Sequence, residues 1–337
     1  MSFVESLFTV WVTFLGLCVG SFLNVVIGRL PHGESIVYPG SRCPKCKNPI
    51  AWYDNIPVVS WLVLNGECRH CKTPISPRYI LVEMLVGILY LLAFQKFGWT
   101  LSLPGPLIFI AFLVALSFID AEHWILPFEI TLPGIAVGLA VSWVGGLHGF
   151  YESLFGALLG FLGLRAVEYF GWLGFRKEAM GAGDKFLFAL IGAFLGWRAL
   201  LGVMLLASIQ GSVFGIAKIW VMRRKGASEK PAETAVAMEE PAVAAAPPPP
   251  EYTMTWEFLK PGLSMGRRLL LLPYSLFLQP IPDPPLDEQG EEVEWKPDLT
   301  NIPFGPWLAL GALEVLLWAE VLAAKLPLAG MEFLFGI

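Results

Sequence analysis

Residues 107–120 read Leu107-Ile-Phe-Ile-Ala-Phe-Leu-Val-Ala-Leu-Ser-Phe-Ile-Asp120, an apolar run that ends on a carboxylate. Asp184 lies in a similar place, because it ends Gly181-Ala-Gly-Asp184 just before the apolar run 186–195. A carboxylate at or near a bilayer costs several kcal/mol unless it is paired, hydrated or protonated. Two such residues, each beside an apolar run, predict a shared acid–base site.

The composition predicts a membrane protein. Hydrophobic residues make up 55% of the 337 residues and charged residues 15%, and the mean hydropathy is +0.62. This is too apolar for an ordinary soluble domain. The first apolar run, Leu7 to Ile27, has no basic segment before it and is therefore predicted to be a retained helix rather than a signal peptide.

The apolar runs predict an all-α, polytopic membrane fold, since about 20 residues let a helix cross a bilayer. We expect about eight transmembrane helices, at about 6–28, 78–96, 105–119, 130–147, 152–170, 185–197, 199–221 and 305–324.

Lys and Arg residues set the expected orientation, because they are enriched in cytoplasmic connections. Most of them lie in the first connection and in two later ones: Arg29, Arg42, Lys45, Lys47, Arg69, Lys72, Arg78, Arg176, Lys177, Arg223, Arg224 and Lys225. The connections on the other side carry only Lys96, Arg198 and Lys325. The N-terminus is therefore predicted to lie outside, with Asp120 and Asp184 on the cytoplasmic side.

Four of the five cysteines form two CxxC pairs, Cys43-Pro-Lys-Cys46 and Cys68-Arg-His-Cys71. Two such turns can place four thiolates around one Zn²⁺ in the tetrahedral geometry that it prefers. Four cysteine ligands leave no open position, so the predicted role is structural. Disulfides are the alternative, which the reducing cytoplasm disfavours. The fifth cysteine, Cys18, is predicted to be a packing residue inside the first span.

If Asp120 and Asp184 lie within hydrogen-bonding distance, they cannot comfortably both ionise, and the pair shares a proton. The charged member can then take a proton from water while the neutral one polarises a peptide carbonyl, as in aspartic proteases. Gly181 and Gly183 would let the backbone approach an extended peptide closely. The alternative is that each aspartate only caps a nearby helix.

Further motifs run along most of the chain. In order, they are Gly20-Ser-Phe-Leu-Asn-Val-Val-Ile-Gly-Arg-Leu-Pro31, Trp52-Tyr-Asp-Asn-Ile-Pro57, Ile75-Ser-Pro-Arg-Tyr79 with Glu83, Asp120 with Leu126-Pro127, Gly181-Ala-Gly-Asp184 and Ile302-Pro-Phe-Gly-Pro306. Together these motifs resemble those of the bacterial type IV prepilin peptidases, membrane aspartic proteases that process pilins and type II secretion pseudopilins. The resemblance covers nearly the whole chain except residues 223–301.

The resemblance implies that Asp120 and Asp184 are the catalytic pair. The enzyme would cut a short basic leader after a glycine at the cytoplasmic face of a bacterial inner membrane. It further implies methylation of the new N-terminal residue, usually phenylalanine, with S-adenosylmethionine as methyl donor. The zinc-binding tetracysteine of the family is matched by a set of four residues: Cys43, Cys46, Cys68 and Cys71.

The expected partners are type IV prepilins or type II secretion pseudopilins and the lipid bilayer, and no nucleic acid. No residue is assigned to the methyl donor, and no oligomeric state is predicted. The alternatives are a peptidase that does not methylate, a non-enzymatic assembly protein with a zinc module, and a transporter.

Substrate binding is assigned to Glu83, Gly181 and Gly183. Glu83 would attract the basic leader, or would simply pair with Arg78. Two positions depart from the family pattern. In the family, an acidic residue usually follows the Leu-Pro pair directly, but here Phe128 follows Leu126-Pro127 and Glu129 comes next. The family usually has a lysine two residues after the second aspartate, whereas Lys185 comes directly after Asp184.

The predicted organisation has five parts. They are a first transmembrane helix (1–28), a cytoplasmic tetracysteine zinc loop (29–77), a transmembrane aspartic peptidase core (78–222), a cytoplasmic insert (223–304), and a last transmembrane helix with its tail (305–337). The insert holds the proline-rich tract 242–250 and the acidic run 287–294, which favour an extended or disordered linker. Its segment 267–278, which begins Arg267-Arg268, is predicted to lie on the membrane surface or to be a sticky patch of that linker.

Overall fold

The structure is a computed structural model that describes residues 3–175, 181–228, 256–260, 262–277, 279 and 302–325. Its regular elements are helices, and the only β-type pairings among these residues are two isolated bridges, Arg42–Pro49 and Glu67–Pro74. The predicted all-α class is therefore confirmed. The proline-rich tract and the acidic run of the insert lie outside the described residues.

The chain divides into two compact units. The first unit comprises Met1–Gly163, Gly183–Gln210 and Pro303–Ile337, and the second comprises Leu164–Ala182 and Gly211–Ile302. Two helices, α6 (Gly146–Phe175) and α8 (Ala199–Ser228), begin in the first unit and end in the second. Both aspartates and all five cysteines belong to the first unit.

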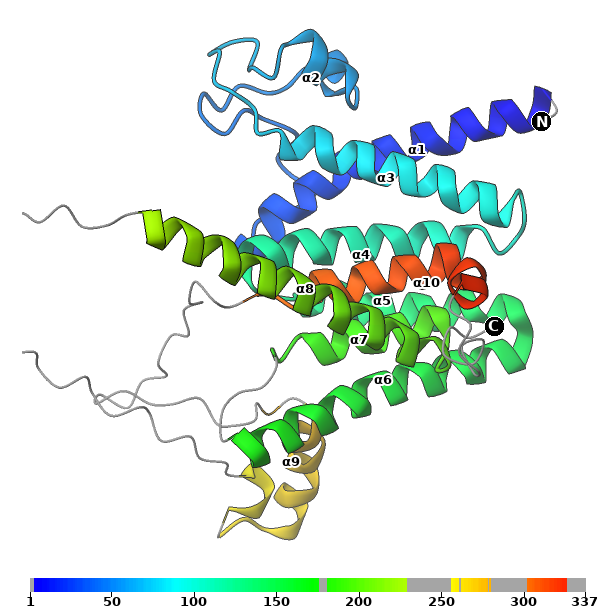
Figure 1. Ribbon diagram of the computed structural model, residues 1–337, viewed down its shortest axis with the longest axis vertical. Coiled ribbons are helices and arrows are strands. Elements are labelled where there is room, and N and C mark those ends of the chain that lie inside the picture. Colours follow the sequence, from blue (N-terminus) through cyan, green and yellow to red (C-terminus); the bar gives the residue numbers. More distant parts are fainter. Residues whose placement is uncertain are drawn as a thin grey trace, which may run out of the picture. The chain divides into compact units, whose positions relative to one another are not determined.

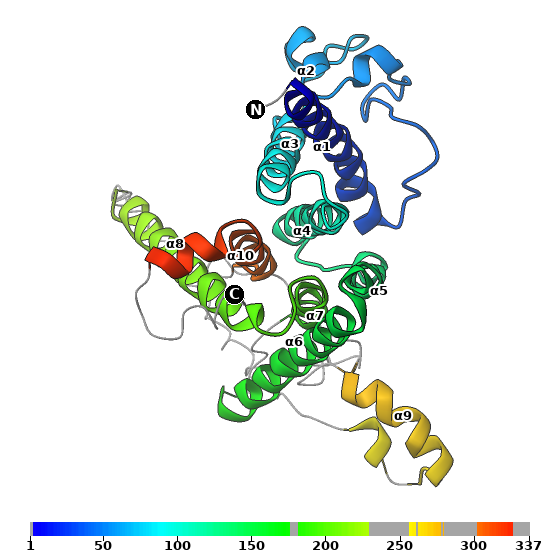
Figure 2. The ribbon, with the colours of Figure 1, turned by 90° about the vertical axis from the view of Figure 1, so that its right-hand side faces the viewer.

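Helix α4 (Pro104–His123) is the central element of the first unit (Figure 2). It contacts α1 (Phe3–Arg29) and α3 (Arg78–Phe97) on one side, and α5 (Phe128–Ser142), α7 (Asp184–Leu195) and α10 (Gly305–Lys325) on the other. Five of its side chains are fully buried: Phe109, Ile110, Leu113, Leu116 and Ile119. A helix that is covered on several sides has no polar stripe, which explains why residues 107–119 are almost uninterruptedly apolar.

Small residues bring α1 and α3 unusually close together (Figure 1). A Cβ added to Gly20 would lie 2.7 Å from the Cα of Glu83, and one added to Gly16 would lie 2.9 Å from the Cα of Gly87. Glycines four residues apart let helix backbones approach in a membrane, where there is no hydrophobic force between helices and packing must supply the attraction.

Each of the eight predicted spans coincides with a helix: α1, α3, α4, α5, α6, α7, α8 and α10. Only six stretches of the described residues, however, are long and apolar enough to cross a membrane, and one of them, Phe128–Gly174, contains both α5 and α6. Helix α7 has 12 residues, which is about 18 Å at a rise of 1.5 Å per residue. The predicted number of about eight transmembrane helices is therefore not confirmed.

The remaining described elements are short: η1 (Leu30–His32), η2 (Trp52–Asn55), α2 (Val59–Val63), η3 (Trp143–Gly145), η4 (Glu257–Leu259) and α9 (Met265–Phe277). Helix α9 packs against η4 within the second unit, and Arg165 of α6 donates to the carbonyl of Ser275 at 3.1 Å. The segment that begins at Arg267 and Arg268 is therefore largely helical. Its position at a membrane surface stays a prediction.

We expect Gly20→Ala to lower the free energy of unfolding, because its Cβ would meet the backbone of α3, which cannot move as a side chain can. The expected loss is about 1–3 kcal/mol, as for other overpacked sites. Gly28→Ala is the matched control on the same helix, since its Cβ would meet no atom closer than 3.9 Å. The thermal unfolding midpoint of each variant in detergent is the measurement. Equal midpoints for the two variants would contradict the close contact of α1 with α3.

Candidate functional site

Asp120 lies on the last turn of α4, where a carboxylate needs compensation. It is only 6% exposed, and a negative charge near a helix C-terminus is disfavoured by the helix dipole. The compensation comes from α10, 185 residues further along the chain, because the N–H of Gly305 donates to Asp120 Oδ2 at 3.0 Å. Gly305 is the first residue of α10, so a helix N-terminus faces the carboxylate, as in other anion sites.

Glycine is required at this position by the space around it. A Cβ on Gly305 would lie 2.5 Å from Asp120 Oδ2 and 3.1 Å from its Cγ. The Pro-Phe-Gly-Pro motif at 303–306 therefore brings a backbone donor close to Asp120, and this role was not inferred from the sequence.

Asp184 is the first residue of α7, and it is also 6% exposed. Gly183, rather than Asp184, occupies the N-cap position. Its carbonyl accepts from the N–H groups of Phe186 and Leu187 at 3.0 and 3.1 Å. Asp184 is therefore not the N-cap residue, although its charge is favourable at a helix N-terminus.

The fold brings the surroundings of the two aspartates together. Helix α7 contacts both α4 and α10. A Cβ added to Gly183 would lie 2.6 Å from the Cβ of Leu126, so the turn before Asp184 packs closely against the turn that follows α4. That turn begins at Trp124, which has a left-handed backbone with φ of 60° and donates its N–H to the carbonyl of Asp120 at 2.9 Å.

The other two residues assigned to substrate binding lie in different places. Glu83 of α3 is 8% exposed, and its Oε2 accepts from the N–H of Val58 at 2.7 Å. It does not pair with Arg78, which instead forms an ion pair with Glu122. That alternative for Glu83 is therefore wrong. Gly181 is exposed and belongs to the second unit.

The four cysteines of the two CxxC pairs converge as predicted. Their sulfur atoms all lie within 4.8 Å of one another. Cys43 and Cys71 approach to 3.7 Å between sulfurs, and Cys46 and Cys68 to 4.0 Å. A tetrahedron with Zn–S bonds of about 2.3 Å separates its sulfurs by about 3.8 Å. The donor set and spacing therefore fit one zinc ion, and the fifth cysteine, Cys18, lies elsewhere on α1.

The two halves of this cluster have the same backbone. Lys47 N–H donates to the carbonyl of Cys43 at 3.0 Å, and Lys72 N–H donates to the carbonyl of Cys68 at 3.0 Å. Both lysines have left-handed backbones, with φ of 58° and 56°. The repeat Cys-x-x-Cys-Lys-x-Pro-Ile, at 43–50 and 68–75, is readable in the sequence and would have indicated this symmetry.

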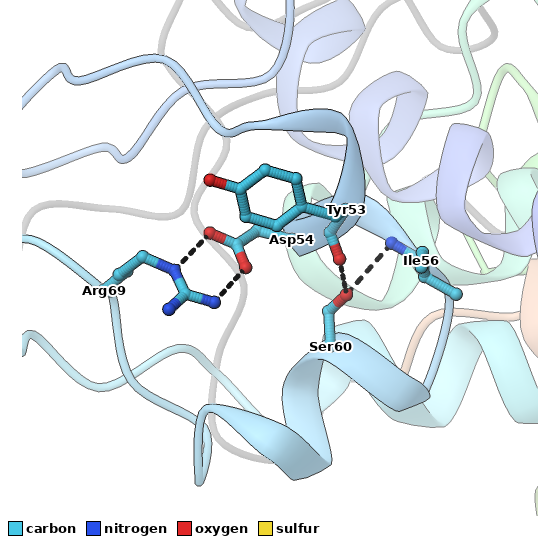
Figure 3. A network of polar contacts seen from close by, with 5 residues as sticks. All are labelled: Tyr53, Asp54, Ile56, Ser60 and Arg69. Atoms are coloured by element: carbon cyan, nitrogen blue, oxygen red, sulfur yellow. Dashed lines mark hydrogen bonds and ion pairs between the residues drawn. The ribbon is translucent and has the colours of Figure 1, made fainter.

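A polar network ties the segment between the CxxC pairs to the second pair (Figure 3). Arg69 donates two hydrogen bonds to the Asp54 carboxylate, from Nε to Oδ2 at 2.7 Å and from Nη2 to Oδ1 at 2.6 Å. These bonds to the guanidinium hold the pKa of Asp54 below its usual range. Ser60 donates to the carbonyl of Tyr53 at 2.9 Å and accepts from the N–H of Ile56 at 3.0 Å. Because the pKa of Asp54 is lowered, this pair stabilises the loop at neutral pH and ceases to do so as the pH falls through the lowered value.

Two family models match the chain. Residues 14–97 match the bacterial peptidase A24 N-terminal domain, and residues 107–216 match the type IV leader peptidase family. A protein of Myxococcus xanthus named prepilin leader peptidase/N-methyltransferase is 53% identical over 321 residues, which are 95% of this chain and 93% of that relative. The chain belongs to the type IV leader peptidase family.

Shorter matches carry the same printed name. The relative of Klebsiella pneumoniae is 43% identical over 59% of this chain and 91% of its own length. The relative of Pseudomonas aeruginosa is 37% identical over 60% of this chain and 78% of its own length. No solved structure matches the chain. With six membrane-capable helical stretches among the described residues, this leader peptidase is a multi-pass membrane protein.

The structure shows the surroundings of Phe128, Glu129 and Lys185, the residues at which the chain departs from the family pattern. Phe128, the first residue of α5, packs edge-on against Phe186 with ring centroids 4.9 Å apart, and Phe161 packs on the same ring at 5.1 Å. An apolar contact therefore replaces an acid at position 128 and supports the start of α7. Glu129 is exposed, whereas Lys185 is buried.

We expect the leader peptidase, purified under reducing conditions, to carry one zinc ion per chain, because its four sulfurs converge on a single point. Cys43→Ser and Cys68→Ser should each lose most of the metal. Cys18→Ser, a cysteine outside the cluster, is the control and should keep it. Inductively coupled plasma mass spectrometry gives the zinc content. A wild-type chain without stoichiometric zinc would exclude the site.

Proposed function

We propose that this chain cleaves the leader of type IV prepilins, or of type II secretion pseudopilins, and then methylates the new N-terminal amine. Two contacts near the aspartates support the proposal. The N–H of Gly305, at the start of α10, donates to Asp120 on the last turn of α4, and Gly183, which precedes Asp184, packs closely against Leu126 in the turn that follows α4. The printed names of the relatives, all prepilin leader peptidase/N-methyltransferase, support both activities.

The chemistry proposed for Asp120 and Asp184 is that of an aspartic peptidase. One ionised carboxylate takes a proton from the attacking water, and the protonated partner donates to the scissile carbonyl. Gly181 and Gly183 precede Asp184 and would let an extended leader pass close to the backbone.

We further propose that both sites face the cytoplasm, with the N-terminus of the chain outside. The excess of Lys and Arg in the first connection supports this orientation. Cleavage belongs to the core of residues 78–222 together with α10, and methylation, with S-adenosylmethionine as donor, to the first helix and the zinc loop of residues 29–77. Zinc serves as a structural ion in that loop, since four thiolate ligands leave it no open position. The segment 223–304 is an insert between the core and the last helix.

We expect Asp120→Asn and Asp184→Asn each to lower leader cleavage by about 10²–10⁴-fold, because an amide can neither take nor share the proton. The assay co-expresses each variant with a prepilin and follows leader loss by gel shift. Glu152→Gln is the control, since this acid pairs only with His148 and Arg198 among the described residues. Mass spectrometry of the mature N-terminus in the wild type should show one added methyl group.

Each outcome of that assay has a distinct meaning. Full cleavage by either aspartate variant would exclude the proposed pair. An unmodified mature amine in the wild type would leave a peptidase without methylation. No leader loss in the wild type would favour a zinc-containing assembly protein or a transporter.

We expect Gly305→Ala to lower kcat for leader cleavage by at least about tenfold while leaving KM nearly unchanged. Its Cβ would displace the Asp120 carboxylate, and a misplacement of about 1 Å can cost about 10²-fold. Gly163→Ala is the control, because its Cβ would meet no atom within 4 Å. An unchanged kcat in Gly305→Ala would contradict the positioning role of α10.

A further inference from the structure

The outward face of helix α9, in the second unit, is apolar. Met265, Leu269 and Leu270 are 76%, 64% and 78% exposed, and Tyr274 is 45% exposed. These four residues are spaced i, i+4, i+5 and i+9, so they lie on one face of the helix. A helix at the surface of a soluble domain normally turns a polar face outward. A contiguous apolar face that is exposed instead indicates an interaction surface.

The opposite face of α9 is held by the protein. Ser275 is fully buried, and its carbonyl accepts from Arg165 of α6 at 3.1 Å. Leu272 is partly buried on the same side. Helix α9 also packs against η4, and the N–H of Glu257 donates to the side chain of Gln279, just after α9, at 3.3 Å. The apolar face is therefore the one that the described residues of this unit leave open.

Arg165 ties α9 to a helix that crosses the membrane, because it lies within the apolar stretch Phe128–Gly174. Helix α6 has 30 residues, which is about 45 Å at a rise of 1.5 Å per residue. The hydrocarbon core of a bilayer is only about 30 Å thick, so about 20 residues cross it. Counted from Gly146, the first residue of α6, those residues end close to Arg165. The bond to Ser275 therefore holds α9 near a membrane–water interface.

A buried ion pair supports this depth. Arg165 bonds to Glu168 at 2.9 Å, and both side chains are buried. Charges on a membrane helix are costly unless protein covers them or water reaches them. Helix α9 supplies part of the cover through the Ser275 carbonyl. It thus lies beside α6 at a level where the helix already carries charges.

The charges of α9 complement an anionic surface. Its charged residues are Arg267 and Arg268, both near its N-terminus. Arg267 is exposed, and Arg268 donates from Nε to the carbonyl of Leu263 at 3.2 Å. Basic residues beside an exposed apolar face are typical of helices that lie in a bilayer interface and attract anionic lipids. Tyr274, with an apolar ring and a polar hydroxyl, suits the same environment.

We propose that α9 docks on the surface of the bilayer around α6. Its exposed apolar residues lie at the boundary between headgroups and acyl chains, and Arg267 faces anionic headgroups. The second unit thereby has a lipid-binding face, which holds the end of α6 at the membrane surface. This inference does not depend on the proposed cleavage or methylation.

The test identifies what covers the apolar face. Leu270 is replaced by the photocrosslinking amino acid p-benzoylphenylalanine, and the full chain is reconstituted in vesicles of equal phosphatidylcholine and phosphatidylglycerol. After irradiation, peptide mass spectrometry should find phospholipid adducts at position 270. Leu272, the same residue type on the partly buried side, is the matched control and should crosslink mainly within the chain.

Competition between the two lipids tests Arg267. The adducts at position 270 should contain phosphatidylglycerol about fivefold more often than phosphatidylcholine, because a basic residue near the surface attracts anionic lipid. Arg267→Gln should lower this ratio at least about twofold. Arg198→Gln removes an exposed charge elsewhere in the chain and should leave the ratio unchanged. An equal fall in both variants, or in neither, would contradict the role of Arg267.

Crosslinks from position 270 to a second copy of the chain, or to another segment of the same chain, without lipid adducts would overturn the proposal. The same replacement at Leu269, which lies on the same exposed face, repeats the test should the Leu270 variant not fold. Leader removal is measured in the same vesicles. A chain that forms the lipid adducts but removes no leader would overturn the proposed peptidase and leave this inference intact.

Discussion

The hydrogen bond from Gly305 N–H to Asp120 joins the end of one buried helix to the beginning of another. Asp120 needs a donor because the dipole of its own helix opposes its charge and because the apolar surroundings supply little water. The N-terminus of α10 supplies that donor, and α10 then packs along α4. A local electrostatic requirement thus fixes the relative position of two helices that are far apart in the sequence.

The need to compensate a buried carboxylate also applies to Asp184, at the start of the short helix α7. A span-length helix beginning at Asp184 would be expected to cross the whole bilayer, whereas α7 ends at Leu195 and is buried along most of its length. Contacts with α4, α5 and α10 cover it. Asp184 can therefore lie at a helix N-terminus, where its charge is favoured, while its helix packs inside the protein.

The sequence predicted those features that depend on residues close together in the chain. Apolar runs predicted the positions of the helices, and CxxC spacing predicted the cluster of four sulfurs. The contact of Gly305 with Asp120 has no local signal, since it depends on packing across 185 residues. The bond from Val58 to Glu83 depends on a strained turn that a valine would not be expected to adopt. The expected number of about eight spans is not confirmed, because hydropathy cannot distinguish burial in protein, as for α7, from burial in lipid.

The two proposed chemistries lie at one end of the first unit. The ion pair between Arg78 and Glu122 links the start of α3 to the last turn of α4, next to Asp120. The amide nitrogen of Asn24, on α1, donates to the carbonyl of Tyr79 at the start of α3. The turn of α4 that holds Asp120 is therefore linked to the start of α3, the helix that follows the tetracysteine loop.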